Sequence, residues 1–286
     1  MGDLTEDRVY DAKAGKQVVY AATGIGVVAV EASRERVGRF GLDHRCEARD
    51  LATGGDPATG GGLLAVATDE DVLLFDGEAY TETGFGPAVA VGFDEGDLLA
   101  AGPDGELGRV VHAVEAFLGE GDAEWLAVAD VDGAVRAIDG PLVAASDGVY
   151  RFTADGIFDV GLTDVRDVVG TETPRAATGD GLYRLGNGWM DELEGAFEVV
   201  TADSASNRAH AATDETFYEL GSDAGAGWTP REIPVGPVVD VAYGERVYAL
   251  SADGTFLIDR GDDWTRRSLG VPDAAALAVW RLELER

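Results

Sequence analysis

The residues best suited to chemistry are charged side chains that recur at one position of a repeated apolar segment. Aligning seven such segments on their first apolar residue gives the column Arg49, Ala90, Arg136, Arg166, Glu198, Asp240 and Leu277. Three arginines and two acids would then lie at one level of the fold. Guanidinium groups bind carboxylates and phosphates through paired hydrogen bonds, so the column could bind an anionic small molecule or a partner's carboxylate. The structural alternative, which we favour, is that Arg166 pairs with Glu198 and the other charges satisfy one another, since buried charges need partners.

Other catalytic and metal-binding patterns are weak. The chain has no G-x-S-x-G, and its glycine-rich run at 53–62 lacks the Lys-Ser/Thr of a phosphate-binding loop and links two predicted strands. His44 and Cys46 stand two apart on a predicted strand, which would put both on one face, but one such pair is thin support for a metal site and we favour packing. Acidic turns lack the twelve-residue calcium pattern. We therefore predict no catalytic residue, no metal and no cofactor.

The elements that position these residues are internal repeats. Residues 142–152 read LVAASDGVYRF, 175–185 read RAATGDGLYRL and 210–220 read HAATDETFYEL. Weaker copies lie at 18–30, 63–75, 98–111 and 248–258. Their central turns recur about every 38 residues, a period typical of propeller blades.

Each copy predicts a β-hairpin, because two short β-rich runs flank Asp-Gly or a similar pair. A second turn and a third strand follow, and a short apolar strand precedes, as in 88–93, 134–139, 165–170, 197–202 and 238–243. Four short strands per unit predict an all-β, seven-bladed β-propeller. A six-bladed ring is the alternative if 98–111 is not a true blade, and a pair of immunoglobulin-like sandwiches would not give seven related hairpins.

The chain begins in the middle of a blade. Residues 18–40 supply three strands, and 275–280 would supply the innermost strand, so the two terminal segments share the blade that closes the ring. We predict that 1–286 is one domain, without a linker or a composition shift. The other blades are expected at 46–83, 87–130, 134–162, 165–193, 197–233 and 238–269.

Composition points to a salt-rich cytoplasm. The chain has 54 acidic and 22 basic residues, a net charge of −32, and only Lys13 and Lys16 are lysines. In dilute salt the negative charges of such a protein repel one another and destabilise its folded state, whereas molar salt screens this repulsion. No basic stripe exists to neutralise phosphates, so we expect no nucleic-acid or membrane partner. One cysteine, Cys46, permits no internal disulfide, and the acidic first residues show no signal peptide.

Three segments resemble a known family. DRVYDAKAG (7–15), VGRFGLDHRCEARDLA (37–52) and VRAIDGPLVAASDGVYR (135–151) are similar to a haloarchaeal family of conserved β-propeller proteins of unknown function. The hairpins also resemble BNR-type and WD-type blades, without the Trp-Asp dipeptide. The resemblance implies a propeller, a halophilic origin and a cytoplasmic location. It implies no catalytic residue.

Function is predicted from the loops and the channel. Insert 112–124 and loop 53–62 should leave the ring on one face, and rigid scaffolds carry binding on such loops. Ala116, Phe117 and Leu118 are apolar within an acidic insert, so we predict a protein partner there, unless Phe117 folds back onto its own blade. The overall prediction is a non-enzymatic binding or scaffolding propeller. The alternative is a hydrolase or lyase at the channel mouth, which should show a pocket with a carboxylate of perturbed pKa.

Overall fold

The repeated segments form β-hairpins, and in four of the blades the turn is held by a threonine at the end of one strand. The Thr68 hydroxyl accepts the Asp71 N–H at 3.0 Å and donates to the Asp71 carbonyl at 2.6 Å. Thr178 makes the same pair of bonds with Gly181, at 3.0 and 2.9 Å. A hydroxyl that mimics a backbone turn lets the chain reverse tightly. In these two blades a threonine three residues before the turn closes thus holds the hairpin through its hydroxyl.

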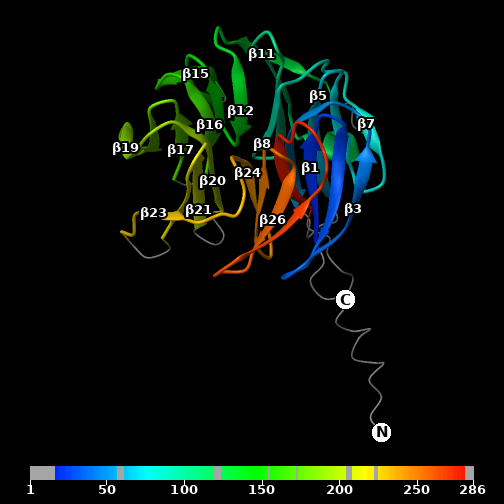
Figure 1. Cartoon of the computed structure of the whole chain (residues 1–286). Coiled ribbons are helices and arrows are strands. Elements are labelled where there is room, and N and C mark those ends of the chain that lie inside the picture. The colour runs from blue at the N-terminus through cyan, green and yellow to red at the C-terminus, as the bar shows by residue number, and fades with distance from the viewer. Residues whose placement is uncertain are drawn as a thin grey trace.

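In the computed structural model, residues 17–56, 61–118, 124–153, 155–171, 173–203, 208–221 and 225–280 are described. Within these ranges, the strands form seven antiparallel sheets of four strands each. The sheets fan around a central axis, and their colours run in order from blue to red (Figure 1). The prediction of a seven-bladed propeller is confirmed, and the segment at 98–111, on which the six-bladed alternative depended, contributes to a complete blade.

The blades are numbered here from the closing blade, with strands given from the channel outward. Blade 1 contains β28 (Ala276–Trp280), β1 (Gln17–Thr23), β2 (Gly26–Ala32) and β3 (Val37–His44). Blade 2 contains β4 (Ala48–Asp56), β5 (Gly61–Thr68), β6 (Val72–Phe75) and β7 (Tyr80–Glu82). Blade 3 contains β8 (Ala90–Asp94), β9 (Asp97–Ala101), β10 (Glu106–Val110) and β11 (Leu126–Asp130). Blade 4 contains β12 (Val135–Asp139), β13 (Leu142–Ala145), β14 (Gly148–Thr153) and β15 (Gly156–Gly161).

The last three blades follow the same plan. Blade 5 contains β16 (Val165–Val169), β17 (Arg175–Thr178), β18 (Gly181–Leu185) and β19 (Trp189–Glu194). Blade 6 contains β20 (Phe197–Asp203), β21 (Arg208–Thr213), β22 (Phe217–Leu220) and β23 (Trp228–Arg231). Blade 7 contains β24 (Val238–Tyr243), β25 (Val247–Ser251), β26 (Thr255–Asp259) and β27 (Trp264–Ser268). The helix in the described ranges is α2 (Ala113–Leu118), between β10 and β11, and no helix there is long and apolar enough to cross a bilayer.

Blade 1 joins the two ends of the chain, as the sequence predicts. Strand β28 pairs with β1 from Val18↔Trp280 to Ala22↔Ala276. In Figure 1 the red C-terminal strand accordingly lies among the blue N-terminal ones. Strand β3 extends to His44, four residues beyond the predicted end of this blade segment. The ring is therefore closed by backbone hydrogen bonds and by side-chain packing between blades 1 and 7.

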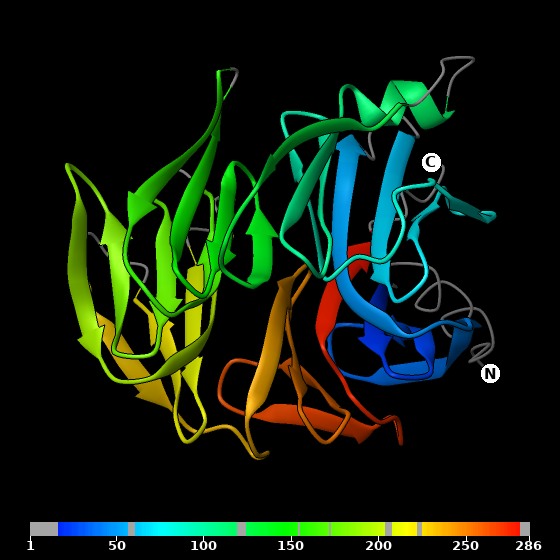
Figure 2. The same ribbon diagram turned by 90° about the horizontal axis from the view of Figure 1, so that it is seen from above.

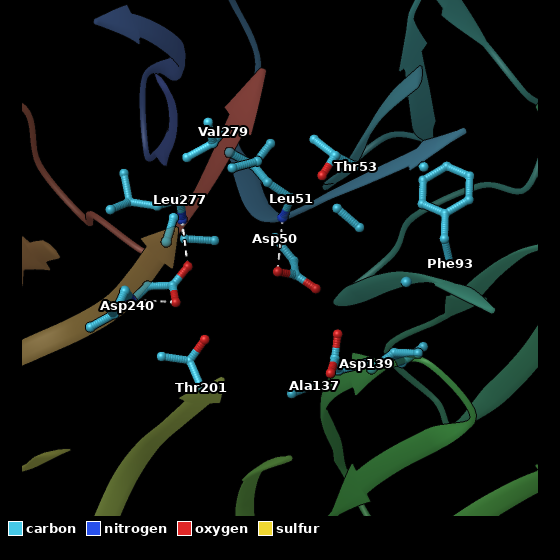
Figure 3. A pocket seen from close by; sticks show the side chains of 18 of the residues that line it. Asp50, Leu51, Thr53, Phe93, Ala137, Asp139, Thr201, Asp240, Leu277 and Val279 are labelled. Atoms are coloured by element: carbon cyan, nitrogen blue, oxygen red, sulfur yellow. Dashed lines mark hydrogen bonds between the residues drawn. The ribbon is translucent and has the colours of Figure 1, made fainter. Parts of the chain in front are cut away.

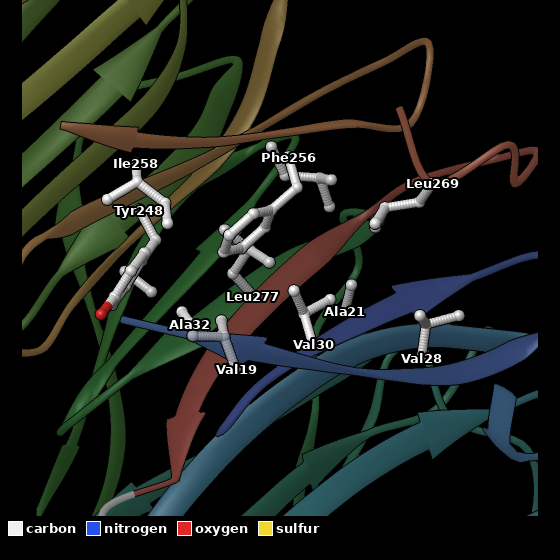
Figure 4. Close-up of a cluster of buried hydrophobic side chains, with 12 residues drawn as sticks. Val19, Ala21, Val28, Val30, Ala32, Tyr248, Phe256, Ile258, Leu269 and Leu277 are labelled. Carbon is white, nitrogen blue, oxygen red and sulfur yellow. The ribbon is translucent and has the colours of Figure 1, made fainter. Parts of the chain in front are cut away.

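The core lies between adjacent sheets. The second strands of the blades are rich in fully buried alanines, such as Ala65, Ala144 and Ala211, and small side chains let sheets approach near the axis. Larger side chains fill the widening space further out. Figure 4 shows one such cluster between blades 7 and 1, where Tyr248 and Phe256 pack against Val30 and Leu277.

Candidate functional site

The innermost strands enclose a central channel of about 820 Å³. Asp50, Asp139 and Asp240 extend into it from three different blades, and Figure 3 shows them around one shared space with Thr201. Asp167 lines the same channel. Four carboxyl groups on rigid strands are thus the polar centre of the molecule.

Three of these aspartates occupy one structural position. The ladders of β4, β16 and β24 each slip by one residue directly before Asp50, Asp167 and Asp240. A β-bulge of this kind re-aims the side chain that follows it. Each carboxylate then accepts the N–H of the next residue in its own strand, at 2.6–2.8 Å.

The second oxygen of each carboxylate reaches the neighbouring blade. Asp50 accepts the Val91 N–H at 2.9 Å and Asp167 the Val200 N–H at 2.8 Å. Asp240 accepts the Leu277 N–H at 2.6 Å and so connects blade 7 to the closing strand. We call these three contacts the inter-blade aspartate bonds. They hold adjacent inner strands at a fixed spacing.

Asp139 differs from the other three. It lies at the end of β12, and its Oδ2 accepts the Gly170 N–H of blade 5 at 2.6 Å. A Cβ at Gly170 would lie 2.3 Å from the Asp139 carbonyl oxygen, so this close approach of the strands requires glycine. No hydrogen bond to Asp139 Oδ1 is formed within the described ranges. Asp139 therefore has a carboxylate oxygen available to a ligand.

The enclosure changes the acidity of these groups. Desolvation raises the pKa of Asp50 and of Asp240 from 3.8 to about 7, with a further contribution from the charge of Asp139. Desolvation is also the main cause that raises the pKa of Asp167 and the pKa of Asp139. The backbone N–H donors oppose this shift and do not outweigh it, because carboxyl groups confined together without a cation favour the neutral form.

The predicted charged column lies at one mouth of the channel, where the inner strands begin. Arg166 donates to Glu198 of blade 6, so the predicted pair is formed. Arg136 donates to Asp164 Oδ1 at 2.8 Å and to the Val165 carbonyl at 3.0 Å, which connects blades 4 and 5. Arg49 pairs within its own blade, with Glu47 at 3.1 Å. All three arginines thus have acidic partners.

Asp240 does not belong to this level. In blade 7 the bulged residue is Val239, which is therefore equivalent to the arginines of the column. Asp240 is equivalent to Asp50 and Asp167, one step further into the channel. The sequence alignment set this strand one residue out of register, because Arg166 and Glu198 follow the first strand residue by one whereas Asp240 follows Val238 by two. Asp50, Asp139 and Asp167 are missing from the predicted site for another reason: if Arg49, Arg136 and Arg166 face the channel, regular alternation without a bulge points these aspartates away from it.

The predicted partner surface is half-buried. Ala116 and Phe117 of α2 pack against the core cluster of blades 2 and 3. The N–H of Ala113 donates to the Gly96 carbonyl at 2.9 Å, which ties the helix to the ring. Figure 2 shows α2 beside the pale-blue strands of blade 2. Helix α2 includes Leu118, whose side chain lies outside the description, so a partner at this surface stays a prediction.

The weaker candidates have structural roles. His44 ends β3 whereas Cys46 lies in the bend before β4, so the two do not share a strand, contrary to the prediction. His44 stacks on Tyr80, and Cys46 packs against the core of blades 1 and 2. Within the described ranges no three His, Cys, Asp or Glu side chains could hold a metal.

The glycine-rich run is mostly strand rather than the predicted loop. Residues 53–56 continue β4 and 61–62 begin β5, whereas 57–60 lie outside the described residues. A Cβ at Gly54 would lie 2.3 Å from the Phe93 ring, so the glycine lets blade 3 pack against β4. Gly54 therefore has a packing role, and the described part of the run is strand.

Comparison with known protein families identifies the family of this chain. Residues 3–280 match the model of the family described as HVO_0234-like, beta propeller. The chain belongs to this family. That match confirms the resemblance drawn from the sequence motifs, and it assigns a fold without an activity. No curated protein matches the chain.

Solved structures agree on the fold. The chain resembles a structure from a nidogen/laminin complex, with TM-score 0.59 and 9% identity over 94% of this chain and 100% of that one. It also resembles the WD40 beta-propeller domain of Doa1, with TM-score 0.61 and 12% identity over 89% and 87% of the two chains. YCF48 bound to D1 peptide gives TM-score 0.55 and 12% identity over 77% and 82%. At these identities the likeness shows the propeller architecture alone.

Chemically, the channel of this family member is lined by many hydrogen-bond acceptors. Three arginines and eight acidic residues line it, and every one of the arginines has an acidic partner. A cation entering the channel would meet carboxylates, whereas an anion would have to displace existing ion pairs. The arrangement is therefore suited to binding positively charged groups.

Proposed function

We propose that this propeller is a non-catalytic binding protein whose channel accepts a small organic cation. The observation that supports the proposal most strongly is the rigid channel of about 820 Å³, in which Asp139 presents an oxygen that the described protein groups leave open. Preformed concave sites with a few convergent polar groups are where small ligands bind. The excess of acids over arginines favours a cation over the anionic ligand that the sequence analysis considered beside the structural alternative.

The bonding of the remaining carboxylates supports a binding role over catalysis. Asp50, Asp167 and Asp240 each engage both oxygens with backbone N–H groups on two strands. A general acid or base must move a proton to or from substrate, and these contacts restrain the side chains from doing so. Their first role is to hold neighbouring blades together.

A hydrolase or lyase is the second candidate, and one observation favours it. The pKa of Asp50 and the pKa of Asp240 are raised to about 7, near the value at which a general acid or base works best. If either residue were catalytic, its conversion to asparagine would abolish turnover of a bound substrate. Under the binding proposal the cation is returned unchanged.

A thermal-shift titration tests the proposal. Spermidine, choline and arginine amide would be compared with glycerol and citrate in molar KCl, with the wild type and Asp139→Asn. We expect a saturable rise in melting temperature with at least one cation, and affinity weakened about 10-fold or more in Asp139→Asn, the loss typical of one charge-assisted hydrogen bond.

The matched control is Asp104→Asn, which removes a carboxylate from an exposed turn of blade 3. It should bind as the wild type does. Saturable binding of citrate alone, no response to any cation, or equal affinity in Asp139→Asn would contradict the proposal.

We also infer that the protein works in a salt-rich cytoplasm. Its net charge of −32 is carried by a folded ring rather than by an acidic tail. Self-repulsion of this size needs a short Debye length to be tolerated. The salt dependence of stability, considered below, is the corresponding test.

A further inference from the structure

The aspartates of the channel lie at two successive levels. Asp50, Asp167 and Asp240 each follow a bulge and so share one level, which we call the aspartate ring. Strand β12 carries the same bulge, and there Ala137 takes the ring position. Asp139 follows two residues later, which at about 3.3 Å per residue places it roughly 6–7 Å further along the channel. Carboxyl groups therefore face the channel at two depths.

The second level has hydrogen-bond acceptors that the protein leaves open. Strand β20 is bulged as β12 is, and Thr201 stands two residues beyond its ring position, as Asp139 does. Figure 3 shows both side chains directed into the space that Asp50 and Asp240 also face. Neither Asp139 Oδ1 nor Thr201 Oγ1 has a hydrogen-bond partner among the described residues. An ammonium group carries three donors and could bond both oxygens at once.

The aspartate ring also keeps capacity to accept hydrogen bonds. Each of its six carboxylate oxygens accepts one backbone N–H, and such an oxygen has room for a second donor. No arginine or lysine pairs with the ring in the described part of the chain, because Arg136 and Arg166 pair with Asp164 and Glu198 at the mouth. Burial raises the pKa of all three ring carboxyl groups, as expected of acids enclosed without a cation. Positive charge is thus lacking at this level too.

The two mouths of the channel differ in charge. The three arginines of its lining lie where the inner strands begin. At the other mouth the lining includes Asp76 and Glu78 of the β6–β7 turn, and the described lining residues there include no base. Trp280, the last residue of the innermost strand β28, lies against Gly77 of the same turn. A cation entering through this acidic mouth meets Asp139 first and the aspartate ring next.

We propose that the channel ligand is a diamine, with one ammonium group at Asp139 and Thr201 and the other at the aspartate ring. This inference rests on the proposed function and names the class of its ligand. The butane spacer of 1,4-diaminobutane has about the length of two strand residues, which is the separation of the two levels. A compact cation with one charge would reach one level and leave the other without positive charge.

Calorimetric titration with three ligands of one length tests the proposal. 1,4-Diaminobutane, 4-amino-1-butanol and 4-aminobutanoate share a four-carbon chain and one ammonium group, and their other end is cationic, neutral or anionic. The titrations are done in molar KCl at pH 8, above the raised pKa of about 7 of Asp50 and Asp240, so that the ring is ionised. We expect 1,4-diaminobutane to bind about 10-fold or more tightly than 4-amino-1-butanol, the effect of one further charge-assisted hydrogen bond. 4-Aminobutanoate should bind more weakly than either.

Variants at the two levels should respond differently. Asp139→Asn should weaken the binding of both amines about 10-fold or more. Asp167→Asn removes one ring charge, so the ratio of the two affinities should fall about 3-fold or more, with Asp50 and Asp240 still present. Asp104→Asn, in an exposed turn of blade 3, is the control for net charge and should bind as the wild type does. If Asp167→Asn fails to fold, the comparison of ligands on the wild type decides alone.

The outcomes separate this inference from the function on which it rests. Equal affinity of the wild type for 1,4-diaminobutane and 4-amino-1-butanol, with both dependent on Asp139, would overturn the diamine and leave a cation-binding channel. An unchanged ratio of affinities in a folded Asp167→Asn variant would overturn the placement of the second ammonium group. Binding of none of the amines, or tightest binding of 4-aminobutanoate, would overturn the diamine and the cation-binding function together.

Discussion

Replacing Asp240 by asparagine should destabilise the protein at low pH and destabilise it less, or not at all, at high pH. The side chain accepts the Val241 and Leu277 N–H groups, each at 2.6 Å, and joins blade 7 to the closing strand. Asparagine has only one carbonyl oxygen, so its NH2 group, which cannot accept a hydrogen bond, would face one of the two backbone N–H donors. Losing that hydrogen bond and leaving a donor unpaired costs about 1–3 kcal/mol of unfolding free energy at every pH.

The opposing contribution comes from ionisation. A carboxyl whose pKa is raised from 3.8 to about 7 on folding stabilises the protein below its unfolded pKa, and that stability is lost as pH rises through the folded pKa. At about 1.4 kcal/mol per pH unit, the wild type loses up to about 3 kcal/mol from Asp240 between pH 5 and pH 7. Asparagine does not titrate and loses nothing over this interval.

Urea unfolding in molar KCl at pH 5, 6, 7 and 8 would measure the difference. Relative to the wild type, Asp240→Asn should gain up to about 3 kcal/mol between pH 5 and pH 8, which reduces or reverses its deficit. Asp104→Asn, in an exposed turn, should show no such trend. A deficit that is constant with pH, or larger at pH 8, would refute the reasoning about Asp240.

Four further predictions concern salt, closure, the helix and a buried histidine. Thermal melts from molar to low KCl should show a falling melting temperature, whereas a flat or rising one would contradict the salt-adaptation inference. Deleting 275–286 removes β28 and should abolish cooperative unfolding, because β1 loses its partner strand. Deleting 1–6 should change stability little, and equal effects of the two deletions would count against the shared blade. Phe117→Asp should lower unfolding free energy by about 2–4 kcal/mol because Phe117 packs on the core of blades 2 and 3, and a stable variant that loses a partner would instead support the binding surface. Burial and the nearby Arg231 charge lower the pKa of His210 to about 3, so stability should fall as pH drops from about 6.5 towards 3, and urea titrations of His210→Phe should lack that slope.

The blade architecture could be predicted because hairpins and their turns are local. Thr178, Asp180 and Gly181 determine one turn through contacts within four residues, and the same pattern recurs in other blades. The pairing of Arg166 with Glu198 also followed, because both occupy the same position of adjacent inner strands. Repetition was sufficient for these inferences.

Asp50 and Asp167 were missed, and Asp240 was placed at the wrong level, because the bulge before each of them is not evident from the sequence. The signal is present as Asp directly after the bulged residue and before an aliphatic one: Arg49-Asp50-Leu51, Arg166-Asp167-Val168 and Val239-Asp240-Val241. Recognising it needs the ladder register, which sequence does not contain. The level shared by Asp139 and Thr201 depends on the same register, in blades 4 and 6.

The central claim is that the channel binds an organic cation without converting it. A crystal structure of the protein soaked with spermidine, with recovery of the ligand for mass spectrometry, tests this most directly. The account predicts ligand density inside the channel with an amine in contact with Asp139 Oδ1, and spermidine recovered intact. An empty channel with the amine bound only on the outer surface, or a chemically altered ligand, would contradict it.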